Sequence, residues 1–134
     1  MGANEDRLDH LRQVRSLADC SDEELETINE LMVEVSIDAG ETLTRQGEAG
    51  RDFVMILEGH ASVTRDGDEI AGVMEGSFVG ELSLLDKTSQ TATVTAMTPL
   101  RACVLNATEF QALLEGAPTL RAKIEQAAED RRPS

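Results

Sequence analysis

The residues best suited to chemistry lie within positions 76–94, where a glycine-bounded turn precedes a short helix and a β-rich segment. Gly80 would let the backbone approach a ligand closely, because glycine has no Cβ atom. A helix that starts near Glu81 would point unsatisfied N–H groups outward, which suits an anion. The Glu81 carboxylate could accept hydrogen bonds from a sugar hydroxyl, or it could only stabilise the helix dipole by about 0.3–1 kcal/mol. The segment therefore predicts a site for a ligand with both phosphate and sugar.

Neighbouring residues extend this candidate site. The Ser83 hydroxyl could donate to a phosphate, and Thr91 and Ala92 could add a hydroxyl and backbone amides. Elsewhere the sequence has no Ser/His/Asp or Cys/His constellation and no metal-ligand spacing, and His10 and His60 are far apart. We therefore expect no catalytic residues and no metal site, and we predict that the protein is not an enzyme.

Composition and charge narrow the class of protein further. The 134 residues suffice for one domain with its own core. The net charge of −14, from 26 acidic and 12 basic residues, disfavours binding to nucleic acid or to an anionic membrane. The sequence has no long apolar run and no signal-peptide pattern, and its two cysteines favour reduced thiols. We expect a cytoplasmic protein without nucleic-acid or membrane partners.

Helices are predicted near both ends of the chain, over residues 4–32 and 107–131. Ser21 and Glu24 form a capping-box pattern, and Asn106 can cap the first of the C-terminal helices. The apolar residues at helical spacing near the N-terminus are Leu8, Leu11, Val14 and Leu17. The sequence after the last predicted helical turns, Arg131-Arg132-Pro133-Ser134, is expected to fray.

The intervening residues 33–105 have the pattern of several short strands. Glycines punctuate short β-prone runs, which is typical of a sandwich or jelly roll. Asp66 and Gly67 predict a tight hairpin turn, and a short helix is expected at about residues 80–86. Strands are predicted over residues 33–37, 42–45, 53–58, 60–65, 69–74, 91–98 and 100–104. We interpret residues 1–134 as a single domain.

Four blocks of residues, in order, resemble the cyclic nucleotide-binding domain family, over roughly residues 8–130. The blocks cover residues 40–48, 53–59, 78–85 and 91–94. The family includes bacterial catabolite activators, regulatory subunits of protein kinase A and cyclic nucleotide-gated channels. The resemblance implies a mainly β fold, a double-stranded β-helix jelly roll with flanking helices. It also implies a regulatory ligand, cAMP in preference to cGMP, and no other cofactor.

The resemblance also implies roles for individual residues. In the family, the glutamate at the position of Glu81 reads the sugar 2′-hydroxyl, and the last helix folds over the ligand as a lid. The ligand-binding set implied for this chain is Gly80, Glu81, Leu82, Ser83, Gln90, Thr91 and Ala92. In the segment that matches the lid, Leu120 or Ile124 could cover the purine. That helix could instead pair two copies of the chain as a homodimer.

Gln90 departs from the family pattern, because the family usually places a phosphate-pairing arginine nine residues after the glutamate. Loss of such a charged pair costs about 2–5 kcal/mol, or roughly 30- to several-thousand-fold in affinity. Lys87 could swing in or could remain in solvent. Arg51 and Arg65 belong to other segments and are not distinguishable from surface charges.

Three functions stay open at this stage. The domain could bind a cyclic nucleotide weakly through backbone amides and Glu81, or it could bind a less charged ligand. Alternatively, it is a degenerate domain that no longer binds nucleotide and serves as a protein–protein interaction module. In each case the output is expected to need an effector protein or domain outside this chain. The few residues after Ala117 cannot supply a DNA-binding helix-turn-helix.

Overall fold

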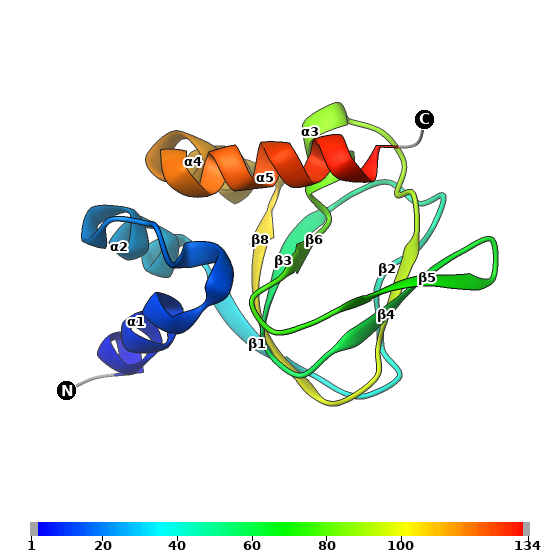
Figure 1. Ribbon diagram of the computed structural model, residues 1–134, viewed down its shortest axis with the longest axis horizontal. Coiled ribbons are helices and arrows are strands. Elements are labelled where there is room, and N and C mark those ends of the chain that lie inside the picture. The colour runs from blue at the N-terminus through cyan, green and yellow to red at the C-terminus, as the bar shows by residue number, and fades with distance from the viewer. Residues whose placement is uncertain (1–2, 133–134) are drawn as a thin grey trace.

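A computed structural model describes residues 3–132, with side chains from residue 7 onward (Figure 1). Two four-stranded antiparallel sheets form a β-roll, with strand orders β1-β8-β3-β6 and β2-β7-β4-β5. The architecture confirms the predicted mainly β fold with flanking helices. The elements are α1 (Ala3–Gln13), η1 (Arg15–Leu17), α2 (Asp22–Leu31), β1 (Val33–Ile37), β2 (Thr42–Thr44), β3 (Asp52–Glu58), β4 (Ala61–Arg65), β5 (Asp68–Val73), β6 (Phe78–Val79), α3 (Glu81–Asp86), β7 (Thr93–Ala96), β8 (Leu100–Asn106), α4 (Ala107–Gly116) and α5 (Pro118–Arg131).

Strand β3 separates two hydrophobic cores. Its side chains alternate between the two faces of the sheet, as the period of a β-strand requires. Phe53, Met55 and Leu57 enter the core beneath the helices, whereas Val54 and Ile56 enter the core inside the β-roll. All five are buried, which explains why this strand reads as a continuous apolar run.

The hairpin between β4 and β5 has the turn that its sequence predicts. Asp66 and Gly67 both adopt positive φ angles, of 55° and 86°. Two consecutive residues with positive φ are the signature of the type I′ turn, whose twist matches that of the strands it joins. The turn places Arg65 at the end of β4, and this position matters for the site described below.

The N-terminal helix is shorter than its apolar spacing predicts. Helix α1 ends at Gln13, and the short 3₁₀ helix η1 carries Leu17, which is still fully buried. The Ser16 hydroxyl donates to the backbone carbonyl of Gly76, which ties η1 to the turn before β6. None of the helices within residues 3–132 has the length and apolar character that crossing a bilayer requires.

Glu24 joins the start of α2 to the start of α5. Its carboxylate accepts hydrogen bonds from the Ser21 N–H at 3.0 Å, from the Thr119 N–H at 2.8 Å and from the Thr119 hydroxyl at 2.9 Å. The first of these bonds completes the predicted capping box. Burial opposes ionisation of Glu24, but the bonds from Ser21 and Thr119 outweigh it and hold the pKa of the carboxyl below its ordinary value.

Replacing Glu24 with glutamine should lower the free energy of unfolding by about 1–3 kcal/mol at neutral pH, because a buried carboxylate loses charge-assisted bonds. A carboxyl with a lowered pKa in the folded state stabilises the protein above its ordinary pKa. That stabilisation is lost as the pH falls through the folded-state value. Urea titrations between pH 3 and 7 should therefore show the difference from wild type shrinking toward acid. The exposed Glu23→Gln serves as the control, and an equal loss there would contradict the assignment.

Candidate functional site

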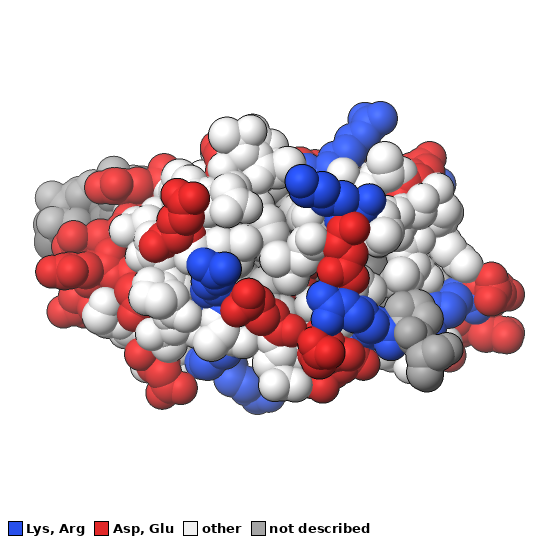
Figure 2. Space-filling model, turned by 90° about the horizontal axis from the view of Figure 1, so that it is seen from above, with Lys and Arg blue, Asp and Glu red and all other residues white. Residues whose placement is uncertain are grey.

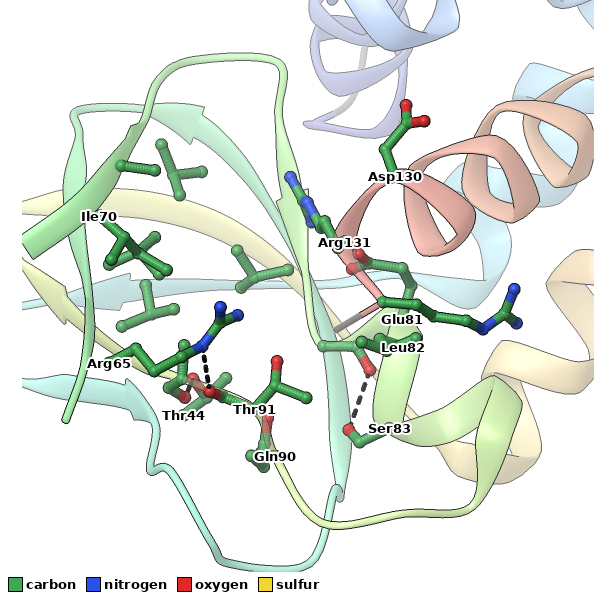
Figure 3. Close-up of a pocket in the computed structure, with 18 of the residues that line it drawn as sticks. Thr44, Arg65, Ile70, Glu81, Leu82, Ser83, Gln90, Thr91, Asp130 and Arg131 are labelled. Atoms are coloured by element: carbon green, nitrogen blue, oxygen red, sulfur yellow. Dashed lines mark hydrogen bonds and ion pairs between the residues drawn. The ribbon is translucent and has the colours of Figure 1, made fainter. Parts of the chain in front are cut away.

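A cavity of about 590 Å³ lies between the sheet that contains β4 and β5, helix α3 and the end of α5 (Figure 3). It brings together every residue of the predicted ligand-binding set. The lining residues include Gly80, Glu81, Leu82, Ser83, Gln90, Thr91 and Ala92. Its volume is within the range of about 300–1,000 Å³ that small-molecule sites occupy. The cavity can therefore hold a ligand of nucleotide size.

The apolar part of the cavity lies on the sheet side. Val63 on β4, Val94 on β7 and Val73 on β5 contribute aliphatic surface. Ile70 also lines the cavity, although its side chain is half exposed at 49%. An exposed aliphatic side chain at a cavity mouth offers a flat aromatic ring a favourable contact. This wall can therefore accept the base of a nucleotide.

Gly80 is required by the fold itself, whether or not a ligand is bound. It has a φ of 93°, a left-handed conformation that glycine adopts without strain. A Cβ atom there would lie 2.2 Å from the backbone oxygen of Asp52. Close approach to β3 is therefore a second reason for a glycine here, and close approach to a ligand stays a prediction. The glycine sets the sharp turn from which α3 starts.

Gly80→Ala should destabilise the protein more than Gly67→Ala by about 1–3 kcal/mol, the usual cost of overpacking. Both glycines have positive φ, so both substitutions carry the same backbone strain of about 1–2 kcal/mol. A Cβ at Gly67 would meet nothing within 4 Å, which makes it the matched control. Urea denaturation of the two variants measures the difference. Equal losses would mean that β3 moves away from the turn at little cost.

Glu81 is a buried carboxylate with one oxygen paired and one unpaired. Its side chain is 1% exposed, and its Oε1 accepts a hydrogen bond from Arg131 Nη1 at 2.6 Å. Among the described residues, no group hydrogen-bonds to Glu81 Oε2. A buried acceptor without a partner costs about 1–3 kcal/mol. The site therefore contains an acceptor that a hydroxyl donor from a ligand would satisfy.

The end of α5 borders the cavity through polar residues, which corrects the sequence-based prediction for the lid. Leu120 and Ile124, predicted to cover the purine, are fully buried in the core beneath the helices. Asp130, Arg131 and Arg132 line the cavity instead. Helical periodicity identifies the apolar stripe of α5, but it does not say which neighbour that stripe contacts.

Two arginines join the end of α5 to α3 and to β6, which precedes it. The C-terminal residues that carry these arginines were predicted to fray. Arg131 Nη1 also donates to the Phe78 carbonyl at 2.8 Å, and its guanidinium carbon lies 5.7 Å from the centre of the Phe78 ring. Arg132 makes two hydrogen bonds of 2.8 Å to Asp86. The Arg132 guanidinium holds the pKa of the Asp86 carboxyl below its usual value. Residues 133 and 134 lie outside the described residues.

Gln90 is held by its backbone, and its side chain has no hydrogen bond to the described residues. Its N–H donates to the Glu48 carbonyl at 2.8 Å, and its carbonyl accepts from the Gly47 N–H at 2.9 Å. The side chain is half-buried and lines the cavity, as the resemblance implies. Lys87 is exposed at the C-terminal cap of α3 and is not among the lining residues described. Lys87 therefore does not supply the missing positive charge in this arrangement.

Arg65 is the cavity residue that the sequence reasoning missed. It is half-buried on β4, and its Nε donates to the Thr91 carbonyl at 3.0 Å (Figure 3). The pairing of Thr64 with Thr93 places Arg65 beside the Thr91–Ala92 stretch. Strand β4 neighbours β7, which comes three strands later in the chain. No local pattern in the sequence indicates that pairing, so Arg65 could not be separated from surface arginines.

Neither cysteine has the surroundings of a reactive thiol among the described residues. Burial raises the pKa of the Cys103 thiol to about 11, which keeps it protonated at neutral pH. Cys20 is half-buried and also free. Among the described residues, no group of three or more His, Cys, Asp or Glu side chains is arranged to hold a metal ion. The cavity is therefore the feature of the described structure with the clearest capacity to bind a small molecule.

The sequence of this chain is similar to those of known cyclic nucleotide-binding proteins. A sequence model of the cyclic nucleotide-binding domain matches residues 34–117. The cAMP-dependent protein kinase regulatory subunit of Yarrowia lipolytica is 32% identical over 106 residues, which is 78% of this chain and 28% of that protein. The chain thus spans less than a third of the length of this relative.

Solved structures share the fold. The regulatory domain of Toxoplasma gondii PKA with cAMP superposes with a TM-score of 0.82 at 22% identity, over 94% of this chain and 50% of that one. A regulatory subunit of a cAMP-independent protein kinase A from Trypanosoma cruzi, bound to guanosine, gives a TM-score of 0.78 at 25% identity. That match covers 90% of this chain and 44% of the other. One fold therefore holds a cyclic nucleotide in one of these proteins and a nucleoside in the other.

Proposed function

Since the chain belongs to the cyclic nucleotide-binding domain family, we propose that it is a regulatory module that senses a cyclic nucleotide in the cavity between α3 and the β-roll. cAMP is the preferred ligand over cGMP, because the relative with 32% identity is named as cAMP-dependent. The observation that carries this proposal is the buried Glu81 carboxylate, whose Oε2 has no partner among the described residues. A ribose 2′-hydroxyl supplies the donor that this oxygen lacks.

The remaining walls fit the other parts of such a ligand. The aliphatic side chains of β4, β5 and β7 can accept a base, and Thr91 and Ala92, which also line the cavity, offer a hydroxyl and backbone amides. Gln90 contributes a neutral amide donor, which is weaker toward phosphate than an arginine. We therefore expect binding in the micromolar to millimolar range, below the strength that a charged residue at position 90 would give.

The end of α5 gives such binding a route to an output. Arg131 and Arg132 link α5 to Glu81 and Asp86, so a ligand hydroxyl that bonds to Glu81 acts on a group that α5 already contacts. A change at Glu81 therefore alters how α5 is held. In this proposal the signal passes through α5 to an effector protein or domain outside this chain.

Calorimetric titration of the nucleotide-stripped protein with cAMP and with cGMP tests the proposal. Binding of cAMP at micromolar to low-millimolar concentration, tighter than that of cGMP, is the expected result. Tighter binding of cGMP would overturn the order of preference. No heat with either ligand at millimolar concentration would refute the sensing function, and it would favour the protein–protein interaction module instead.

A further inference from the structure

Three arginines line the cavity, and two of them already have carboxylate partners. Arg131 pairs with Glu81, and Arg132 pairs with both Asp86 and Glu129. Figure 2 looks down on the side of the molecule that carries α4 and α5, and it shows basic side chains among acidic ones in the middle and right of that face. Arg65, the third, has no ion pair with any carboxylate in the described part of the chain. It is therefore the lining residue whose positive charge is still available to a ligand.

The guanidinium of Arg65 is oriented by its one hydrogen bond. Its Nε donates to the Thr91 carbonyl at 3.0 Å, and the side chain extends into the cavity from β4 (Figure 3). Within residues 3–132, Nη1 and Nη2 have no hydrogen-bond partner. A guanidinium carries five N–H donors in a planar fork that matches the geometry of a phosphate. Because Nε is already bonded to the backbone, little side-chain entropy is lost when the two terminal nitrogens bind an anion.

Partial burial makes the lack of a counter-charge costly for Arg65. A charged group that leaves water loses solvation, which an anionic partner can offset. The chain carries an excess of acidic residues, with a net charge of −14, yet none of the described ones pairs with this arginine. An anionic ligand is the natural partner for a cation held in this way.

We propose that Arg65 on β4 supplies the positive charge that binds the phosphate of the ligand, in place of a charged residue at position 90. This inference rests on the proposed function and deepens it. The ligand then lies with its hydroxyl edge at Glu81 and its anionic group toward Arg65 and Thr91. Arg65 on β4 thereby replaces the positive charge that position 90 lacks. The site keeps a preference for phosphorylated nucleosides.

Calorimetry of Arg65→Met and Arg65→Lys with cAMP and with adenosine tests the role of the charge. Arg65→Met should weaken cAMP binding by about 10- to 100-fold, the usual effect of removing a charge-assisted bond. It should leave adenosine binding within about twofold, because adenosine has no phosphate. Arg65→Lys keeps the charge without the planar fork, so its affinity for cAMP should lie between those of wild type and Arg65→Met. The exposed Arg15→Met, which is not among the residues that line the cavity, is the control for net charge and should leave both affinities unchanged.

Two outcomes of this titration would overturn the inference while leaving the proposed function intact. The first is equal weakening of cAMP and adenosine, since Arg65 would then support the cavity without reading the phosphate. The second is unchanged cAMP binding in Arg65→Met.

Inorganic phosphate separates this inference from the proposed function. In ¹⁵N-labelled protein, the Arg65 Nε–H resonance, identified by its loss in Arg65→Met, should shift as phosphate is added, and the Arg15 resonance should not. If wild type binds no cyclic nucleotide but the Arg65 resonance shifts, the sensing function fails and the anion site stands. If the Arg65 resonance does not respond to phosphate, the anion site is refuted whatever the calorimetry shows.

Discussion

Gln90→Arg is expected to strengthen the binding of cAMP by at least about tenfold, because a desolvated charge pair with phosphate contributes about 2–5 kcal/mol. Position 90 lines the cavity, so a longer cationic side chain can reach a ligand there. The fold should tolerate the change, since Gln90 is held by its own N–H and carbonyl, which any residue provides. Calorimetry measures the affinity, and urea denaturation checks that the free energy of unfolding changes by less than about 0.5 kcal/mol.

The matched control for this substitution is Gln111→Arg, which adds the same charge at an exposed position of α4. It should leave cAMP affinity unchanged. A gain in affinity in Gln111→Arg would mean that the added charge acts through the electrostatic field of the whole protein and not through contact with the phosphate. Gln90→Arg should also help more in the Arg65→Met background than in wild type. Two arginines near one phosphate share it, so their effects should not add. Unchanged cAMP affinity in Gln90→Arg would contradict the view that position 90 limits binding.

Glu81→Gln is expected to weaken cAMP binding by roughly 10- to 150-fold, since a hydrogen bond to a charged group contributes about 1.5–3 kcal/mol. Glutamine keeps the shape of the side chain but removes the charge from the acceptor. Glutamine also loses the charge-assisted bond from Arg131, so the free energy of unfolding should fall by about 1–3 kcal/mol.

A nucleotide without the 2′-hydroxyl makes this test specific. Wild type should bind 2′-deoxy-cAMP as weakly as Glu81→Gln binds cAMP. The substitution should then cause no further loss with the deoxy ligand, because the bond it removes is already missing. If Glu81→Gln weakens both ligands equally, the carboxylate acts through Arg131 and the position of α5. It would then not contact the sugar.

Several features followed from short stretches of sequence. The capping boxes at Ser21 and Asn106 formed as their spacing predicted, and the Asp66-Gly67 turn has the expected positive φ angles. The predicted set of seven ligand-binding residues lines one cavity, because those residues lie in two short segments, one at the start of α3 and one shortly after its end. Their roles in binding stay predictions until the titrations are done.

The sequence by itself determined the flanking helices, the tight turn and the β-rich middle of the chain, because capping, turn geometry and strand alternation act between residues close in the chain. The β-roll and the roles of the site residues followed from the resemblance to the family. Only the tertiary structure decided which charges meet at the candidate site. Arg65 reaches the cavity because β4 pairs with β7, and Arg131 reaches Glu81 because α5 packs across α3. Such contacts join residues about 26 and 50 positions apart. These contacts depend on long-range packing, which the local periodicity of the sequence does not predict.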